Sequence, residues 1–342
     1  MTSTRKLTRI PNLFALIPFT WQGPNPLHCN SPEIRSTLEW ARSQGDLDGS
    51  IQQKIDKAVC ELFGAFAYPY ANIDMLLFTN DSTAMIIILD EYAETADLQS
   101  AEKLRHTVMN AMTGKTPEDN SLVANITRDL VKRLTEASVG LDTVINRYIH
   151  MYDLYLKSLV EEVKLRRENE VLSVKDYVVH RRENSTVRFY HIFIEVALGV
   201  KLPKDVLEDP DFIKANNLGI DLTSIANDIY SFGAEYFQGV EDNNIVSAYK
   251  NEKNCTVQEA LDHVEVHYVN TLNEFMACRK RIRSYGSEID GALHDYMIGI
   301  EQLVWGTIVW TSGSKRYWED GATLQKTHTF ELKRQGEGIR VI

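Results

Sequence analysis

Apolar residues recur at intervals of three and four along much of this chain, which is the spacing of one face of an α-helix. The clearest stretch has apolar residues at Val257, Leu261, Val264, Tyr268, Leu272 and Phe275. Thr256 and Glu259 have the spacing of a capping box, which predicts that a long amphipathic helix begins there. Similar patterns predict helices near residues 145–167, 173–182, 221–237 and 293–309.

The patterns typical of β-structure are missing from the sequence. No alternating apolar runs are joined by Asn-Gly or Asp-Gly turns, and no strand leads into a glycine-rich nucleotide-binding turn. Loops are predicted at residues 23–26, 113–120, 202–211 and 285–287, and none has the length or composition of an interdomain linker. We therefore predict one all-α domain over residues 1–318, followed by a polar and mobile tail over residues 319–342.

Charge and cysteine content exclude some functions. The 342 residues include 37 Lys plus Arg and 48 Asp plus Glu, a net charge of −11 with neutral histidines. Sequence-independent nucleic-acid binding needs clustered cations and is disfavoured. Cys29, Cys60, Cys255 and Cys278 are far apart in the sequence and form no zinc-ligand pattern, which suits a reducing compartment.

Targeting and membrane signals are also weak. Basic residues precede a short apolar run near the amino terminus, but Pro18 ends that run too early for a signal peptide. The longest strongly apolar stretch elsewhere, residues 84–89, is far shorter than the roughly 20 residues of a transmembrane helix. We expect a soluble, cytoplasmic protein.

Three small oxygen-bearing side chains, Asn227, Ser231 and Glu235, follow one another at steps of four residues within a predicted helix. Four residues advance a helix by roughly 400°, so the three side chains lie on one face, about one turn apart. A carboxylate, an amide oxygen and a hydroxyl suit Mg²⁺ or Mn²⁺. The alternative is an ordinary polar helix face.

An acidic cluster, Asp90, Glu91 and Glu94, directly follows the apolar residues 85–89. Asp90 and Glu94 are one helical turn apart, where their charges repel unless cations are bound. This predicts a second set of metal ligands. The alternative is a solvated helix end.

Two further clusters offer donors to an anion. Arg181 and Arg182 end a predicted helix, and arginine binds phosphate through a planar fork of donors. Arg316 and Tyr317 place a cation beside a hydroxyl near the carboxyl terminus. The alternatives are surface salt bridges for the arginine pair and a favourable helix-dipole interaction for Arg316.

Taken together and in this order, the four clusters resemble the class I terpene synthases, most closely the sesquiterpene synthases of basidiomycete-type fungi. The segment from Asp90 to Glu94 is similar to that family's aspartate-rich motif. Asn227, Ser231 and Glu235 match its NDxxSxxxE triad residue for residue.

The two basic clusters complete the resemblance, which spans about residues 11–318. Arg181 stands where the family's diphosphate-sensing arginine is expected, with Arg182 close enough to leave the choice between them open. Arg316 and Tyr317 match the family's RY pair.

The resemblance implies a class I terpenoid-synthase helical bundle with a central active-site cavity. It implies ionisation of farnesyl diphosphate, cyclisation of the resulting carbocation and release of inorganic diphosphate, by a monomer or a homodimer. Three Mg²⁺ ions, with Mn²⁺ as a substitute, are expected between the two acidic motifs. The implied metal ligands are Asp90, Glu91, Glu94, Asn227, Ser231 and Glu235, and the implied diphosphate donors are Arg181, Arg182, Arg316 and Tyr317.

Three positions depart from the family pattern. Glu94 stands where Asp is commoner, and Ala234 stands where some members carry a diphosphate-binding lysine. Residues 184–186 replace a glycine whose carbonyl helps to trigger ionisation in many members. The Asn-Ser sequence after Arg182 resembles that of fungal members that close the ring between carbons 1 and 10 more than that of members that close it between carbons 1 and 11.

The implied cavity must be dry, because water would quench a carbocation, and aromatic rings can stabilise the migrating charge. The candidate lining residues are aromatic residues near the motifs, which are also typical of core packing. They are Phe63, Phe66, Tyr70, Tyr230 and Trp310.

Other functions remain open from the sequence. A chain-elongating prenyltransferase has the same helical fold but normally carries aspartate-rich motifs on both helices. A di-iron bundle needs Glu-x-x-His on two helices, which this chain lacks. His263 and His267 have the spacing of a metal-binding pair, although exposed histidines on a long helix are the commoner interpretation. A non-catalytic helical scaffold is the alternative from a different class.

Overall fold

The computed structural model describes residues 7–141 and 143–334, and these fold almost entirely into α-helices, which confirms the predicted all-α class. The first nine helices are α1 (Leu13–Leu16), α2 (Leu27–Asn30), α3 (Thr37–Ser43), α4 (Gly49–Ala58), α5 (Cys60–Ala67), α6 (Ile73–Thr95), α7 (Leu98–Met112), α8 (Leu122–Ala137) and α9 (Val144–Glu168). The others are α10 (Val174–Asn184), α11 (Val187–Leu198), α12 (Lys204–Leu207), α13 (Pro210–Gln238), α14 (Ile245–Lys253), α15 (Val257–Arg281), α16 (Ser287–Gly313) and α17 (Gly321–Thr327).

The long helices follow the predicted periodicity. α9, α10, α15 and α16 confirm the expected helices, and the capping box of Thr256 and Glu259 is present at the start of α15. α13 is longer than predicted, because it begins at Pro210 within the expected loop. Pro210 suits the first turn of a helix, and the side chain of Asp209 accepts hydrogen bonds from the amides of Asp211 and Phe212.

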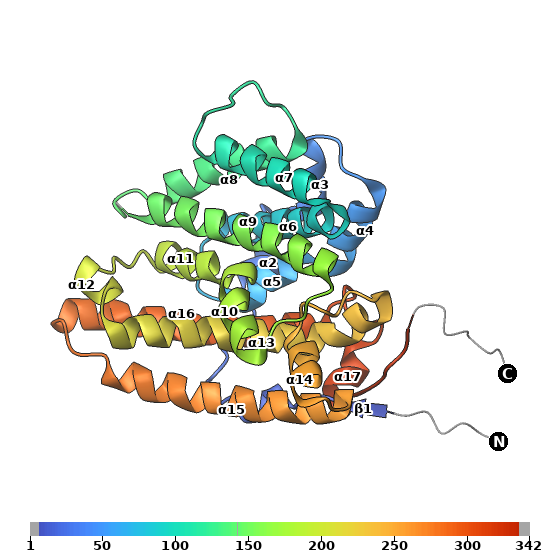
Figure 1. Cartoon of the computed structure of the whole chain (residues 1–342). Helices are drawn as coiled ribbons and strands as arrows, with labels where there is room; N and C mark the ends of the chain where they lie inside the picture. Colours follow the sequence, from blue (N-terminus) through green and yellow to red (C-terminus); the bar gives the residue numbers. More distant parts are fainter. Residues whose placement is uncertain (1–6, 142, 335–342) are drawn as a thin grey trace, which may run out of the picture.

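The helices form layers that bring the motif-bearing helices together. Figure 1 shows α15 along one side of the molecule, α13 and α16 beside it, and α7 and α8 at the opposite side. α13 contacts both α15 and α16, while α5 contacts both α6 and α16. α10 contacts both α9 and α13. This arrangement brings the helices that carry the predicted motifs, α6, α10 and α13, into the same part of the bundle.

A glycine allows the close approach of α16 and α5. A Cβ atom at Gly306 would lie 2.4 Å from the backbone nitrogen and the Cα of Ala67, a separation that van der Waals contact forbids. The contact matters for the site because α16 leads directly to Arg316 and Tyr317.

The two ends of the described chain pair as short antiparallel strands. β1 (Leu7–Arg9) pairs with β2 (Thr329–Glu331), with Thr8 opposite Phe330. The buried ring of Phe330 packs against Trp318, with ring centroids 5.3 Å apart. Figure 1 shows β1 and α17, which lie near the two ends of the described chain, on the same side of the molecule.

The tail expected after residue 318 therefore contains a helix, α17, and a strand, β2, as far as residue 334. The sequence signals were too short to predict either element, and β2 is formed by pairing with a segment more than 300 residues away. Residues 335–342 of the expected tail lie outside the described residues. None of the described helices combines the length and apolar character that crossing a bilayer requires.

The Gly306 contact can be tested by adding one methyl group. Gly306→Ala should lower the free energy of unfolding by about 2 kcal/mol or more, because the new Cβ meets the backbone of Ala67. Chemical denaturation followed by circular dichroism measures this change.

Gly291→Ala is the matched control in the same helix, since a Cβ there meets no atom within 4 Å. It should stabilise the protein by up to about 1 kcal/mol, the difference in helix propensity between the two residues. Equal effects of the two substitutions would show that the Gly306 contact is not tight.

Candidate active site

The predicted triad lies on α13, near the carboxyl end of this 29-residue helix. The Ser231 side chain is buried, and its hydroxyl donates a hydrogen bond of 3.4 Å to the backbone carbonyl of Asp228. The triad does not lie on a solvated polar face of the helix, because most residues of α13 around it are buried. The three oxygen-bearing side chains point into the protein.

Asn227 connects the triad to two clusters that are far away in the sequence. Its Oδ1 accepts a hydrogen bond of 3.1 Å from Nη2 of Arg181, which lies on α10. Its Nδ2 donates to the hydroxyl of Tyr317 over 3.4 Å. Three of the predicted site residues, from three parts of the sequence, therefore meet at one amide.

Arg181 and Arg182 have different surroundings. Arg181 is mostly buried, forms an ion pair of 2.8 Å with Asp228 and lies beside Asn227. Arg182 points away and donates two hydrogen bonds of 2.7 Å to Asp221. Consecutive helical residues are about 100° apart, so only one of the two can face the triad. That residue is Arg181.

Asp90 lies near the carboxyl end of α6 and accepts a hydrogen bond of 2.8 Å from the hydroxyl of Tyr155. The pKa of this carboxyl is raised to about 7, mainly by burial, and the charges of Glu162 and Glu94 contribute to the rise. The hydrogen bond from Tyr155 and the charge of Arg316 act in the opposite direction. The acid is therefore poised close to neutrality, where a bound cation would readily displace its proton.

Glu91 and Glu94 share a cation from the protein itself. The ammonium of Lys54 on α4 pairs with Glu91 and lies 3.5 Å from Oε2 of Glu94. Glu94 is 38% exposed, whereas Oε1 of Glu91 is buried without a hydrogen-bond partner among the described residues. Glu91 thus has an acceptor available, and Glu94 lies at the solvent edge of the cluster.

Glu235 is a second acid whose pKa is raised to about 7. Burial is the main cause and the charge of Asp228 adds to it, while the polar side chains of Ser231 and Asn244 oppose the shift. Nδ2 of Asn244 donates to Oε2 of Glu235 over 2.9 Å. Two acids with raised pKa values thus lie on separate helices, α6 and α13.

Arg316 lies near the acidic cluster on α6. The charges of Asp90 and Glu91 act on its guanidinium, whose Nη1 is buried without a hydrogen-bond partner in the described part of the chain. Its neighbour Tyr317 reaches Asn227 on α13. The pair therefore connects the acidic cluster on α6 to the triad on α13, with one donor of Arg316 still available.

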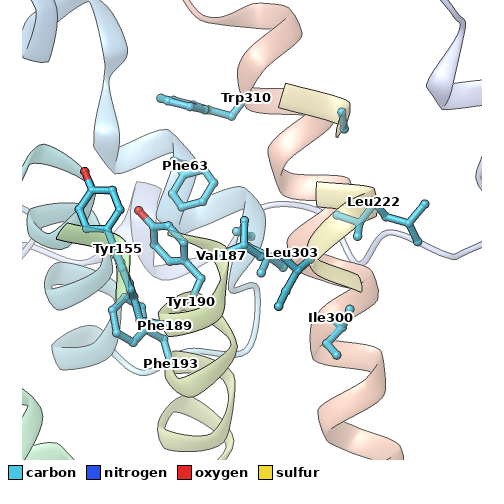
Figure 2. Close-up of a cluster of buried hydrophobic side chains, with 14 of the residues drawn as sticks. Phe63, Tyr155, Val187, Phe189, Tyr190, Phe193, Leu222, Ile300, Leu303 and Trp310 are labelled. Carbon is cyan, nitrogen blue, oxygen red and sulfur yellow. The ribbon is translucent and has the colours of Figure 1, made fainter. Parts of the chain in front are cut away.

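An aromatic cluster adjoins these polar groups. The ring of Phe63 lies 5.2 Å from the rings of both Tyr190 and Trp310, and Trp310 is 5.9 Å from Tyr317. Figure 2 shows Phe63 between Trp310 and Tyr190, with Tyr155 close by. Because Tyr155 also binds Asp90, the polar and apolar parts of the site share a wall.

Two expected lining residues, Phe63 and Trp310, lie in this cluster, and the other three face elsewhere. Phe66 packs against Trp21, with ring centroids 5.8 Å apart. Tyr70 contacts Tyr68, and Tyr230 lies near the backbone of Leu13. Neighbouring helices decide which face of a helix a ring occupies, and spacing alone does not show this.

The donor set fits a hard cation together with an anion. Asn227, Ser231 and Glu235 on α13, and Asp90 and Glu91 on α6, carry oxygen atoms of the kind that Mg²⁺ prefers as ligands. The unpartnered Nη1 of Arg316 and the unpartnered Oε1 of Glu91 have opposite charges. An anion bound together with cations would satisfy both atoms, whereas either ion alone would leave one without a partner.

Comparison with known proteins decides the family. The family described as "Terpene synthase family 2, C-terminal metal binding" matches residues 81–274, more than half of the chain. The chain belongs to terpene synthase family 2. It is therefore a terpene cyclase, a carbon–oxygen lyase, and the family description implies a divalent metal and a prenyl diphosphate substrate. The matched region contains Asp90, Arg181 and the triad on α13.

Individual proteins are similar in sequence to this synthase over nearly its whole length. "Sesquiterpene synthase 6" of Postia placenta is 25% identical over 97% of each chain. "Linoleate 10R-lipoxygenase COP4" of Coprinopsis cinerea is 25% identical over 97% of this chain and 95% of its own. The crystal structure of germacradien-4-ol synthase from Streptomyces citricolor has a TM-score of 0.75 at 19% identity, covering 90% of this chain and 99% of that one. This likeness shows the class I helical fold.

Several residues of the terpene synthase site were not predicted from the sequence. Asn184 accepts a hydrogen bond of 2.9 Å from Nη1 of Arg181, and its own amide donates to the buried Glu162 over 2.8 Å. The hydroxyl of Tyr177 donates to Asp228 over 2.5 Å. Asp228, adjacent to Asn227 in the motif, could have been found from sequence. Glu162 and Tyr177 had no distinguishing pattern, because tertiary contacts alone bring them to Arg181 and Asp228.

The turn between α10 and α11 also lies near Arg181, since Asn184 at the end of α10 accepts a hydrogen bond from it. Thr186 has a φ of +66°, in the left-handed region that β-branched residues rarely adopt. This is the segment in which the sequence departs from the family's glycine. The backbone takes up the turn without glycine, and strain of this kind is common at functional sites.

The histidine pair singled out in the sequence lies in a different place. Nδ1 of His267 lies 2.8 Å from the hydroxyl of Tyr249, and the ring of His263 stacks on Tyr249. These residues line a surface cleft of about 460 Å³, which includes none of the predicted site residues. The pair is therefore separate from the site on α6 and α13.

The raised pKa values predict how stability depends on pH in the metal-free synthase. Asp90 and Glu235 have folded-state pKa values of about 7, above their ordinary values of 3.8 and 4.5. At pH values between the ordinary pKa and the folded-state pKa, each of these acids is protonated in the folded protein and ionised in the unfolded chain. The stability of the folded protein therefore falls as the pH rises toward about 7. Denaturation in a chelator at about pH 5.5 and about pH 8 should show this loss.

Asp90→Asn provides the comparison, because it removes one of the two acids whose pKa is raised to about 7 and keeps the shape of the side chain. The variant should lose less stability than the wild type between the two pH values. An equal loss in both proteins would mean that Asp90 is ionised at low pH in the folded state.

Proposed function

We propose that this terpene synthase ionises farnesyl diphosphate and cyclises the resulting carbocation to a cyclic sesquiterpene, with release of diphosphate. One observation carries the proposal. Arg316 and Tyr317 connect the acidic cluster on α6 to the triad on α13, directly beside the aromatic cluster of Phe63, Tyr190 and Trp310. A site with a charged half and an apolar half suits a substrate with a diphosphate head and a hydrocarbon chain.

Each wall of the polar half would hold divalent cations. Asn227, Ser231 and Glu235 supply three different oxygen donors from one side, and Asp90 supplies a carboxylate from the other, with Glu91 next to it. Glu94 is the more exposed acid and would contribute least. We expect Mg²⁺, with Mn²⁺ as a substitute; as a Lewis acid the cation neutralises charge on the diphosphate leaving group.

Three side chains of the site would bind the diphosphate directly. Arg316 has an unpartnered donor, and Tyr317 adds a hydroxyl beside it. Arg181 is the third, because it already lies against Asn227, whereas Arg182 is held by Asp221. Preorganised donors of this kind stabilise the charge that develops on the leaving oxygen as the allylic C–O bond breaks.

The apolar half would hold the farnesyl chain. The rings of Phe63, Tyr190 and Trp310 exclude water from the carbocation and present π-faces to it. The relatives that carry the name sesquiterpene synthase support the fifteen-carbon substrate. The choice of carbons for ring closure is expected to depend on the shape of this cluster.

The proposal is tested by offering the enzyme prenyl diphosphates of each chain length with Mg²⁺ and identifying the products by gas chromatography and mass spectrometry. Farnesyl diphosphate should give cyclic fifteen-carbon products at the highest kcat/KM. Asn227→Ala and Glu235→Ala should reduce turnover by about 100-fold or more while the circular dichroism spectrum is unchanged. Elongated prenyl diphosphates as products, or full activity of both variants, would refute the proposal.

The role of Arg316 is tested separately by diphosphate binding. Arg316→Ala should weaken the binding of inorganic diphosphate in the presence of Mg²⁺ by about 10-fold or more, because a charged hydrogen bond to the anion is lost. Isothermal titration calorimetry measures this affinity. Lys315→Ala is the matched control: Lys315 is the exposed neighbour, and its loss should change the affinity little. Equal losses in the two variants would indicate only a long-range charge effect.

A further inference from the structure

Asn244 is a buried asparagine that the motifs do not include. It precedes α14, it is 0% exposed, and its side-chain oxygen and both amide hydrogens have hydrogen-bond partners. Its Oδ1 accepts a hydrogen bond of 2.9 Å from the amide of Val246. Its Nδ2 donates to the carbonyl of Asp228 over 3.0 Å and to Oε2 of Glu235 over 2.9 Å.

These partners fix the orientation of the amide. Rotating it by 180° would place Oδ1 against the carbonyl of Asp228 and the carboxylate of Glu235, and would place two hydrogens against the amide hydrogen of Val246. Only one orientation satisfies all three contacts. The donor that faces Glu235 is therefore held in place by α14 on one side and by the α13 backbone on the other.

The next residue strengthens the same connection. The backbone amide of Ile245 donates to Oδ2 of Asp228 over 3.3 Å, and Oδ1 of Asp228 accepts from Arg181. The start of α14 thus contacts two acids of α13, the carboxylate of Glu235 through Asn244 and the carboxylate of Asp228 through Ile245.

We propose that Asn244 is a positioning residue, which holds the carboxylate of Glu235 in the orientation that binds the metal. The inference rests on the proposed role of Glu235 as a metal ligand. A carboxylate at the end of a flexible side chain has several rotamers, and fixing one oxygen by a hydrogen bond limits the directions in which the other can point. Asn244 would thus reduce the entropic cost of metal binding without touching the metal or the substrate.

An ordinary helix cap does not account for the contacts of Asn244. A capping asparagine needs only its side-chain oxygen, as at Asn72, which accepts from the amide of Met75 at the start of α6 and is exposed. Asn244 makes the same capping contact, and it also uses both amide hydrogens on the helix that carries the triad.

Asn244→Ser separates the capping contact with α14 from the hydrogen bonds to α13. Serine is an equally good N-cap, so α14 keeps its capping contact, but its short hydroxyl cannot replace both amide donors. Calorimetric titration of the protein with Mg²⁺ and inorganic diphosphate should show affinity about 10- to 100-fold weaker than in the wild type. In turnover assays the Mg²⁺ concentration for half-maximal rate should rise by a similar factor, while kcat at saturating Mg²⁺ falls much less.

Asn72→Ser is the matched control, since it makes the same replacement at an exposed cap. It should leave both the affinity and the turnover unchanged. Asn244→Gly, which is also tolerated at an N-cap, serves as the second variant and should give the same loss if Asn244→Ser does not fold. Wild-type affinity in either folded variant of Asn244 would overturn the inference.

Glu235→Gln shows which hypothesis fails. If this variant still binds Mg²⁺ and diphosphate normally, then the metal-binding role of Glu235, and with it the proposed function of the triad, is wrong. If Glu235→Gln loses binding and Asn244→Ser keeps it, only the role of Asn244 is wrong. Loss of binding in both variants, with helical content unchanged by circular dichroism, supports the two together.

Discussion

The buried ion pair between Arg181 and Asp228 is the contact on which the rest of the site depends. It joins α10 to α13 over 2.8 Å, and both side chains are largely shielded from water. An arginine alone in this position would be costly to bury, and so would an aspartate. Once paired, they leave Nη2 of Arg181 beside Asn227, and the amide of Asn227 in turn reaches Tyr317.

Several other charged groups of the site lack a partner of opposite charge or a hydrogen-bond partner among the described residues. Asp90 and Glu235 have pKa values near neutrality because burial disfavours their ionised forms, and Arg316 keeps a donor without a partner. A folded protein normally pairs such groups. Cations near the acids and an anion near Arg316 would provide such partners, as the proposed metal–diphosphate group would. The raised pKa values of Asp90 and Glu235 also make the metal-free protein less stable near neutral pH than at lower pH.

The helical scaffold places this charged region against an apolar one. α16 packs closely on α5 through Gly306, which sets Trp310 beside Phe63 and leads the chain to Arg316 and Tyr317. The short pairing of β1 with β2 then brings Phe330 against Trp318, directly after the RY pair. Distant parts of the chain thus fix the position of residues that the sequence shows only as neighbours.

The sequence by itself determined the helical class and the capped start of α15, and it singled out the candidate site residues, because these depend on spacing within one helix. Only the tertiary structure decided between Arg181 and Arg182, separated Phe63 and Trp310 from Phe66 and Tyr230, and brought Asn244 to Glu235. Each of those outcomes depends on which helix packs against which face. Local periodicity in the sequence shows that a helix has an apolar or polar face. Long-range packing decides which neighbouring helix and which side chains that face contacts.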